Sequence, residues 1–249
     1  MSSANPGLAY EDTPPLSAPL RFFLTAPLFG MCAGLVLLFG DGVLGSRWTP
    51  GALAAVHLLA AGFMLQVMIG ALQQILPVVA GVRFPAVLGV ASSSHALLTF
   101  GAAGLAGGLA FGLPDAIIGG AMLLLGGIGI FLIAALAGLI RSPSVKIPSH
   151  APRDLRLAMA GLAVTAVLGL ALALAIGRGA TLPIPLAQAV DLHAAWGWLG
   201  WGGILLAATS WVVVPMFQIT PSYPARFTRW WAPAVLAGLA SWSLARSFD

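Results

Sequence analysis

The sequence predicts an all-α protein, a polytopic membrane helix bundle of about seven transmembrane helices. Hydrophobic residues make up 59% of the 249 residues and charged residues only 7%, against about 25% charged residues in an ordinary soluble domain. The mean hydropathy is +0.99. These values exclude a soluble globular domain and a disordered chain. The net charge is only +4 and the sequence has no basic run, so we expect no nucleic-acid binding.

The predicted spans follow from the length of the apolar stretches, because a helix needs about 20 residues to cross the hydrocarbon core. Such stretches cover residues 20–40, 51–82, 84–112, 114–140, 155–177, 185–219 and 230–245. Residues 1–19 are polar and rich in proline. We therefore expect a flexible N-terminal tail over residues 1–19 and a single transmembrane domain over residues 20–249.

The basic residues predict the orientation, because cytoplasmic loops carry an excess of Lys and Arg. With seven crossings, the tail and the even-numbered connections share one face. That face would carry eight basic residues, Arg21, Arg83, Arg141, Lys146, Arg153, Arg156, Arg226 and Arg229. The opposite face would carry three, Arg47, Arg178 and Arg246. The N-terminus is thus expected in the cytoplasm, and the protein in the bacterial inner membrane.

Three of the four histidines lie inside predicted spans, where ionisable groups are costly and usually functional. His57 and His193 each stand about eight residues before the middle of a span that enters from the outer face, roughly 12 Å from the midplane at the helical rise per residue. His95 lies nearer the centre of the third predicted span. A neutral imidazole in an apolar environment can bind a metal. The alternative is that these histidines form hydrogen bonds within helix-packing faces.

The neighbours of the histidines predict a slot for a flat ligand. Small residues share the helical face of His193, and Met64 shares that of His57. A porphyrin needs apolar walls and an imidazole at the iron. We therefore expect haem ligation by His57 and His193, with His95 as a further metal position. The residues expected around the cofactor, including two outer arginines for its carboxylates, are Arg47, Arg178, Met64, Gly197 and Gly200.

Two segments of the chain resemble each other and resemble a known family. HLLAAGFMLQVMIGALQQILPVVAGV begins at His57 and HAAWGWLGWGGILLAATSWVVVPMFQIT begins at His193. The His-x-x-x-Gly-Trp pattern of the second and the Leu-Pro ending of the first resemble histidine-bearing helices of haem–copper oxidase and nitric oxide reductase catalytic subunits. The stretch SSSHALLTFG around His95 is similar to an element of NnrS-type haem membrane proteins. The resemblance implies haem b at His57 and His193, and one further metal or ligand position at His95, for which copper is a candidate.

The sequence departs from this family in ways that reduce what the resemblance implies. Those oxidases have about twelve spans and an adjacent histidine pair at copper, whereas this chain has about seven spans and no His-His pair. Asp191 stands where the family has the first histidine of a His-x-His motif. The sequence therefore does not predict an oxygen-reducing binuclear centre or a proton pump.

Three functions remain open at this point. The first is haem b-based electron transfer or diatomic gas (O2 or NO) binding or chemistry. An enzyme of this kind would be an oxidoreductase, with a redox partner or quinol. The second is a copper-handling protein or a small-molecule transporter using intramembrane His and Met, and the third is an assembly subunit without a cofactor. Glycines in spans three and four indicate close helix packing, either within the chain or in a homo-oligomer.

Overall fold

The chain is helical throughout the part that the structure describes. The structure, a computed structural model, describes residues 14–80, 82–141 and 150–246, and these contain no strand. The single long helices are α1 (Ser17–Phe39), α4 (Val87–Phe111), α5 (Pro114–Arg141), α6 (Ala151–Arg178) and α9 (Ala225–Arg246). A short 3-10 turn, Val43–Gly45, follows α1. The all-α prediction is confirmed. Residues 1–13 of the predicted tail lie outside the described residues, and α1 already begins at Ser17.

Two further long helices each contain a π-helical segment. The first consists of α2 (Pro50–His57), the π segment Leu58–Met64 and α3 (Leu65–Ala80), and we call it the His57 helix. The second consists of α7 (Leu186–Ala195), the π segment Trp196–Gly203 and α8 (Ile204–Gln218), and we call it the His193 helix. The side chain of Thr49 caps the start of α2 by accepting a hydrogen bond from the Ala52 amide at 3.1 Å.

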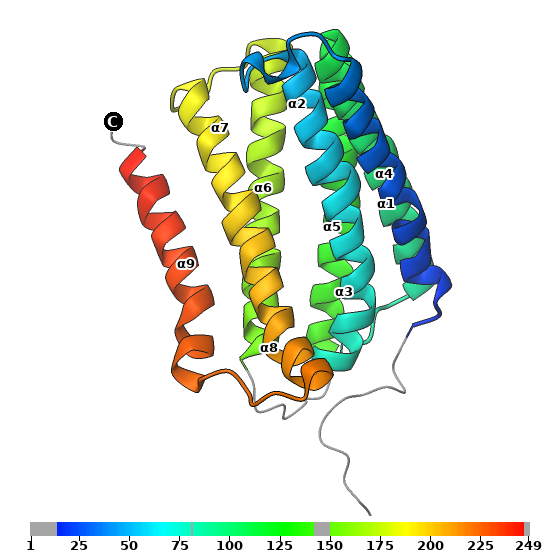
Figure 1. The fold of residues 1–249 in the computed structure, drawn as a ribbon, viewed down its shortest axis with the longest axis vertical. Helices are drawn as coiled ribbons and strands as arrows, with labels where there is room; N and C mark the ends of the chain where they lie inside the picture. The colour runs from blue at the N-terminus through cyan, green and yellow to red at the C-terminus, as the bar shows by residue number, and fades with distance from the viewer. Residues whose placement is uncertain (1–13, 81, 142–149, 247–249) are drawn as a thin grey trace, which may run out of the picture.

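Within the described part of the chain, six helices are long and apolar enough to cross a membrane. They are α1, the His57 helix, α4, α5, α6 and the His193 helix, and they correspond to the first six predicted spans. The chain is therefore an integral membrane protein by the length and composition of its helices. Helix α9 forms where the seventh span is predicted, but it is not among the six. In Figure 1 it stands at the edge of the bundle beside α7 and α8.

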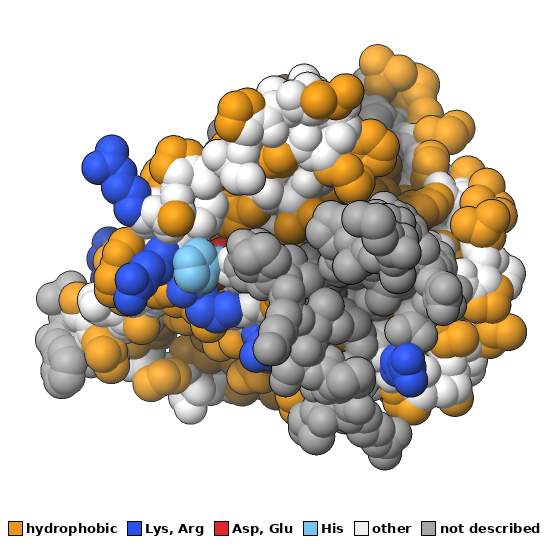
Figure 2. Space-filling view, turned by 90° about the horizontal axis from the view of Figure 1, so that it is seen from below, with side chains coloured by type: hydrophobic (Ala, Val, Ile, Leu, Met, Phe, Trp, Pro, Cys, Tyr) orange, Lys and Arg blue, Asp and Glu red, His pale blue; other side chains and the backbone are white. Residues whose placement is uncertain are grey.

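The long helices alternate in direction (Figure 1). The end of the bundle drawn at the top carries the α1–α2, α4–α5 and α6–α7 connections, and we call it the upper end. The lower end carries the beginnings of α1, α4, α6 and α9. Seen from below, basic side chains lie around the lower end and apolar side chains around the perimeter (Figure 2). An apolar perimeter suits contact with lipid.

Close helix contacts depend on glycine at two places. A Cβ atom on Gly120 of α5 would overlap the backbone of Leu105 on α4. A Cβ atom on Gly161 of α6 would overlap the carbonyl of Gly200 in the His193 helix. Small residues let transmembrane helices approach this closely. Packing within the chain thus accounts for these glycines, whereas Gly107 and Gly119 face open space.

Candidate ligand site between the two histidine helices

His57 is the last residue of α2, where the helix changes to its π segment. Its Nδ1 lies 2.7 Å from the carbonyl oxygen of Leu53. A carbonyl can only accept, so Nδ1 carries the hydrogen and Nε2 carries the lone pair. Nε2 makes no hydrogen bond within the described residues. The imidazole is therefore oriented by its own helix, with a free ligand atom.

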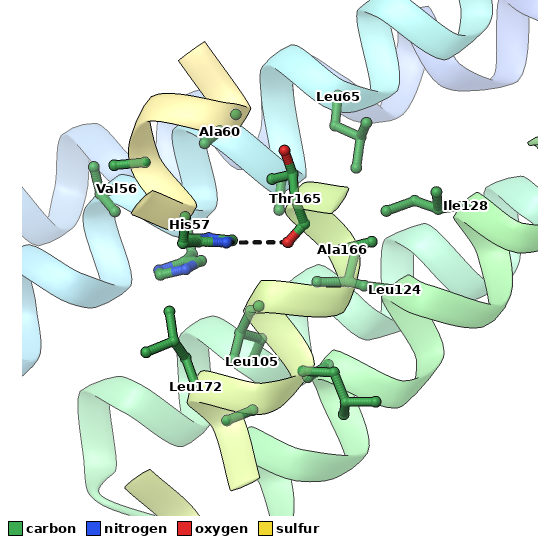
Figure 3. A pocket seen from close by; sticks show the side chains of 18 of the residues that line it. Val56, His57, Ala60, Leu65, Leu105, Leu124, Ile128, Thr165, Ala166 and Leu172 are labelled. Atoms are coloured by element: carbon green, nitrogen blue, oxygen red, sulfur yellow. Dashed lines mark hydrogen bonds between the residues drawn. The ribbon is translucent and has the colours of Figure 1, made fainter. Parts of the chain in front are cut away.

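His193 has the same tautomer as His57, but its hydrogen bond goes to a different helix. Its Nδ1 donates to the carbonyl oxygen of Thr165 on α6, at 3.1 Å (dashed line in Figure 3). Its Nε2 likewise has no hydrogen-bond partner in the described part of the chain. Gly169, one turn after Thr165, makes room for the ring, because a Cβ there would lie 3.0 Å from Cε1 of His193. Thr165 and Gly169 therefore set the position of His193.

The two imidazoles lie opposite each other in the interior. Their ring centroids are 6.4 Å apart and their planes differ by 19°. The arrangement is stacked, and its centroid separation lies within the range of about 4.5–7 Å for stacked or edge-to-face aromatic pairs. The two rings are therefore neighbours in the interior, with planes that are close to parallel.

A π-helical segment begins directly after His57 and three residues after His193. Such segments are rare and occur frequently at functional sites, because the extra residue changes the direction in which side chains point. Their similar positions support the internal repeat seen in the sequence. The two histidines thus occupy corresponding places in two similar helices.

An apolar cavity of about 290 Å³ surrounds the histidine pair. This volume is just below the range for small-molecule sites, about 300–1,000 Å³. Side chains from both histidine helices and from α4, α5 and α6 line it, including the labelled Leu65, Leu105, Leu124 and Leu172 (Figure 3). Besides the histidines, only Thr165, Trp198 and Trp201 contribute polar side-chain atoms to the lining. The cavity is an apolar chamber with two imidazoles in its wall.

The two histidine helices do not pack extensively against each other. The His193 helix packs on α6, whereas the His57 helix packs mainly on α1 and α4 and meets α6 only through α3. Within the described residues, the polar link between them is an ion pair at the upper end, where Nη1 of Arg47 lies 2.7 Å from Oδ1 of Asp191. The cavity therefore occupies the space between two helices that are held apart.

The structure separates His95 from the other two histidines. His95 lies on α4, and its Nε2 is 2.8 Å from Oγ1 of Thr25 on α1. The ring of Phe22 meets it edge-on, with 5.1 Å between centroids. Thr99 lies 3.5 Å from the same Nε2 and accepts a hydrogen bond from the buried Gln66 at 3.4 Å. His95 therefore belongs to a polar chain between α1, α3 and α4.

The described residues contain no group of three or more His, Cys, Asp or Glu side chains that could hold a metal ion. At the predicted further metal position, the polar neighbours of His95 include the hydroxyl groups of Thr25 and Thr99. Met64 and Met68, in contrast, both line the cavity with His57.

The remaining predicted site residues lie in three different environments. Gly197 and Met64 line the cavity. Gly200 instead packs against Gly161 of α6 and the ring of Trp196. Arg47 pairs with Asp191 near the cavity, whereas Arg178 pairs with Asp115 and joins the ends of α6 and α5. Of the two arginines predicted for cofactor carboxylates, only Arg47 is linked to a histidine helix.

Sequence analysis did not single out the buried carboxylate Asp154, which is fully buried in the first turn of α6. Two nitrogens of Arg153 donate to its Oδ1, at 2.9 and 2.7 Å, and Trp211 Nε1 lies 3.3 Å from its Oδ2. Arg153 also donates to the carbonyl of Thr228 on α9. Asp154 and Arg153 therefore connect the beginning of α6 with α8 and α9 at the lower end.

No protein-family model, curated protein or solved structure matches this chain. The fold and the site together define a helical integral membrane protein with an apolar interior cavity between two opposed histidines.

Proposed function

We propose that the protein is a haem b protein of the bacterial inner membrane that transfers electrons, in which His57 and His193 would together hold the haem iron. The observation that carries the proposal is the geometry of the two imidazoles. An imidazole nitrogen binds a first-row metal at about 2.0–2.1 Å and lies about 1 Å from its ring centre, so two axial imidazoles have centroids roughly 6 Å apart. The observed separation is 6.4 Å.

The donor set fits a haem in three further respects. Both Nδ1 atoms donate to backbone carbonyls, those of Leu53 and Thr165, which leaves both Nε2 atoms available. A second hydrogen bond of this kind orients a metal-binding histidine and raises its basicity. The cavity walls are apolar. Haem, when bound there, would supply one-electron redox chemistry, and its potential would be tuned by these axial ligands.

The chain's own residues determine which haem chemistry is favoured. If both imidazoles held the iron, no position on it would remain for a gas molecule, which favours electron transfer over oxygen or nitric oxide chemistry. The separate position of His95, bonded to Thr25, provides no second metal next to the cavity. An oxidoreductase reaction with a membrane quinol or another redox partner would then supply or accept the electron.

The membrane arrangement is part of the same proposal. Helix α9 would form the seventh crossing, with the N-terminus in the cytoplasm and the basic lower end on the cytoplasmic side. The His57 and His193 segments would relate the chain to the haem–copper oxidase or NnrS-type proteins that they resemble. Gly107 and Gly119, which face open space, would be available for contact with a second copy.

Absorption spectroscopy tests the proposal. The protein purified in detergent from haem-supplied cells should show a Soret band and, in a pyridine haemochrome assay, one haem b per chain. His57→Ala and His193→Ala should each lose most of the haem. His95→Ala is the matched control and should retain it. A colourless wild-type protein, or equal retention in all variants, would overturn the proposal.

A copper-handling function is the second candidate, because Met64 and Met68 line the cavity together with His57. Thioether and imidazole are suitable ligands for Cu(I). Elemental analysis separates the two candidates. Copper bound without haem, and lost in Met64→Leu and Met68→Leu, would support copper handling. Iron bound as haem and unaffected by these substitutions would exclude it.

A further inference from the structure

An ion pair at the upper end joins the loop before the His57 helix to the His193 helix. Arg47 lies in the loop before α2, and Asp191 lies on α7, two residues before His193. The cavity begins close to both, since Leu53 and Val56 of α2 and Val190 of α7 line it. Neither residue of the pair lines the cavity, but both lie close to these lining residues, and we call this place the mouth of the proposed haem site.

The pair is accessible and can exchange its partners. The side chains of Arg47 and Asp191 are 57% and 40% exposed. Exposed ion pairs of this kind contribute little to stability. The guanidinium has five N–H donors, and Asp191 is its only hydrogen-bond partner within the described residues. Most of the donors of Arg47 are thus available to another carboxylate.

The ring of Trp48 holds the guanidinium in place. The Cζ atom of Arg47 lies 4.9 Å from the centroid of this ring, within the range of a cation–π contact. The cation would therefore keep its position at the mouth when its carboxylate partner changes. A guanidinium fixed in this way can bind a carboxylate through two parallel hydrogen bonds.

We propose that Asp191 occupies, in the ligand-free protein, the place of a carboxylate of the ligand. In this inference, which rests on the proposed function, the cavity takes a tetrapyrrole with free carboxylates, and one of them competes with Asp191 for Arg47. The acid form of the ligand is thereby selected over an ester. Asp191 lowers the affinity for the ligand in two ways. Its ion pair with Arg47 must break, and its carboxylate then lies beside the negatively charged carboxylate of the ligand.

Titration of the haem-free protein tests this inference. Protein purified in detergent from haem-depleted cells is titrated with iron protoporphyrin IX and, in parallel, with its dimethyl ester, and binding is followed by the Soret band. Arg47→Gln should weaken binding of the acid about tenfold, and Asp191→Asn should strengthen it several-fold. Neither substitution should change binding of the ester.

Two other residues at the upper end provide matched controls. Asp115 pairs with Arg178 outside the cavity lining, and Arg246 lies over the ring of Trp242, with 5.7 Å to its centroid. Asp115→Asn and Arg246→Gln repeat the two charge changes away from the mouth. Both should bind the acid and the ester as the wild type does.

The outcomes distinguish this inference from the proposed function. If acid and ester bind alike and the Arg47 and Asp191 variants match the wild type, the carboxylate exchange is wrong while haem ligation stands. Equal weakening by Arg47→Gln and Arg246→Gln would also overturn the exchange, because it would show a general effect of charge. If the wild type binds neither compound, the proposed function fails and this inference fails with it.

Discussion

Gly169 offers the sharpest test of how His193 is positioned. It lies on α6, one turn beyond the Thr165 carbonyl that holds the imidazole. A Cβ at this position would lie 3.0 Å from Cε1, 3.5 Å from Nδ1 and 3.9 Å from Nε2 of His193. Gly169→Ala therefore adds one methyl group against the ring of one proposed ligand.

The distances determine the expected effect. Optimal contacts between carbon atoms are at about 3.5–4.0 Å, so the ring must retreat by about 0.5 Å. The hydrogen bond from Nδ1 to Thr165 is already 3.1 Å long, near the upper end of the usual range of about 2.7–3.2 Å. Retreat of the ring would lengthen or break this bond. Loss of such a supporting partner typically lowers metal affinity about 10–100-fold, and we expect a decrease of this size in haem affinity.

Haem titration of the detergent-purified protein measures this effect, with the melting temperature followed in parallel. Gly119→Ala is the control, because it adds the same methyl group to a transmembrane helix at a position with nothing within 4 Å. We expect Gly169→Ala to bind haem at least about tenfold more weakly and Gly119→Ala to match the wild type. Unchanged haem affinity in Gly169→Ala would refute the role assigned to the α6 contact.

Three further predictions concern the bundle around the site. Gly120→Val should destabilise the α4–α5 contact by about 1–3 kcal/mol and lower the melting temperature, whereas an unchanged value would contradict the packing described. His95→Ala should leave the haem spectrum unchanged and cost about 1 kcal/mol of stability through loss of its bond to Thr25; a changed Soret band would place His95 at the haem. Trp211→Phe removes a donor to the buried Asp154 and should cost about 1–3 kcal/mol in thermal unfolding, and no loss would show that Arg153 alone satisfies the carboxylate.

The six membrane helices could be predicted because apolar length alone determines them. The first six predicted spans each correspond to a helix in the structure. The ends differ by several residues, as at α6, which begins at Ala151 instead of residue 155. Polar and charged residues in the first turn, such as the buried Asp154, are paired by neighbours that a hydropathy pattern does not reveal.

The site could be predicted only in part. The equal predicted depth of His57 and His193 and the motif that they share indicate that the two side chains meet, and the structure places their rings next to each other. Depth and motif spacing can be read from the sequence because both depend only on distance along a helix. His95 was added because it also lies within a predicted span, but the direction of a side chain around its helix depends on how α1 and α4 pack, and His95 lies beside Thr25 of α1. The carbonyl groups of Leu53 and Thr165 were missed, because backbone acceptors leave no signal in the sequence. The π segments were also missed, since one additional residue in a helical turn hardly changes an apolar pattern.

The central claim is that His57 and His193 bind the same iron from opposite sides. Near-infrared magnetic circular dichroism of the oxidised protein identifies the pair of axial ligands directly. The account predicts a low-spin haem with two imidazole ligands, lost when either histidine is replaced by alanine. A high-spin haem with one histidine ligand, or a spectrum unaffected by one of the two substitutions, would contradict it.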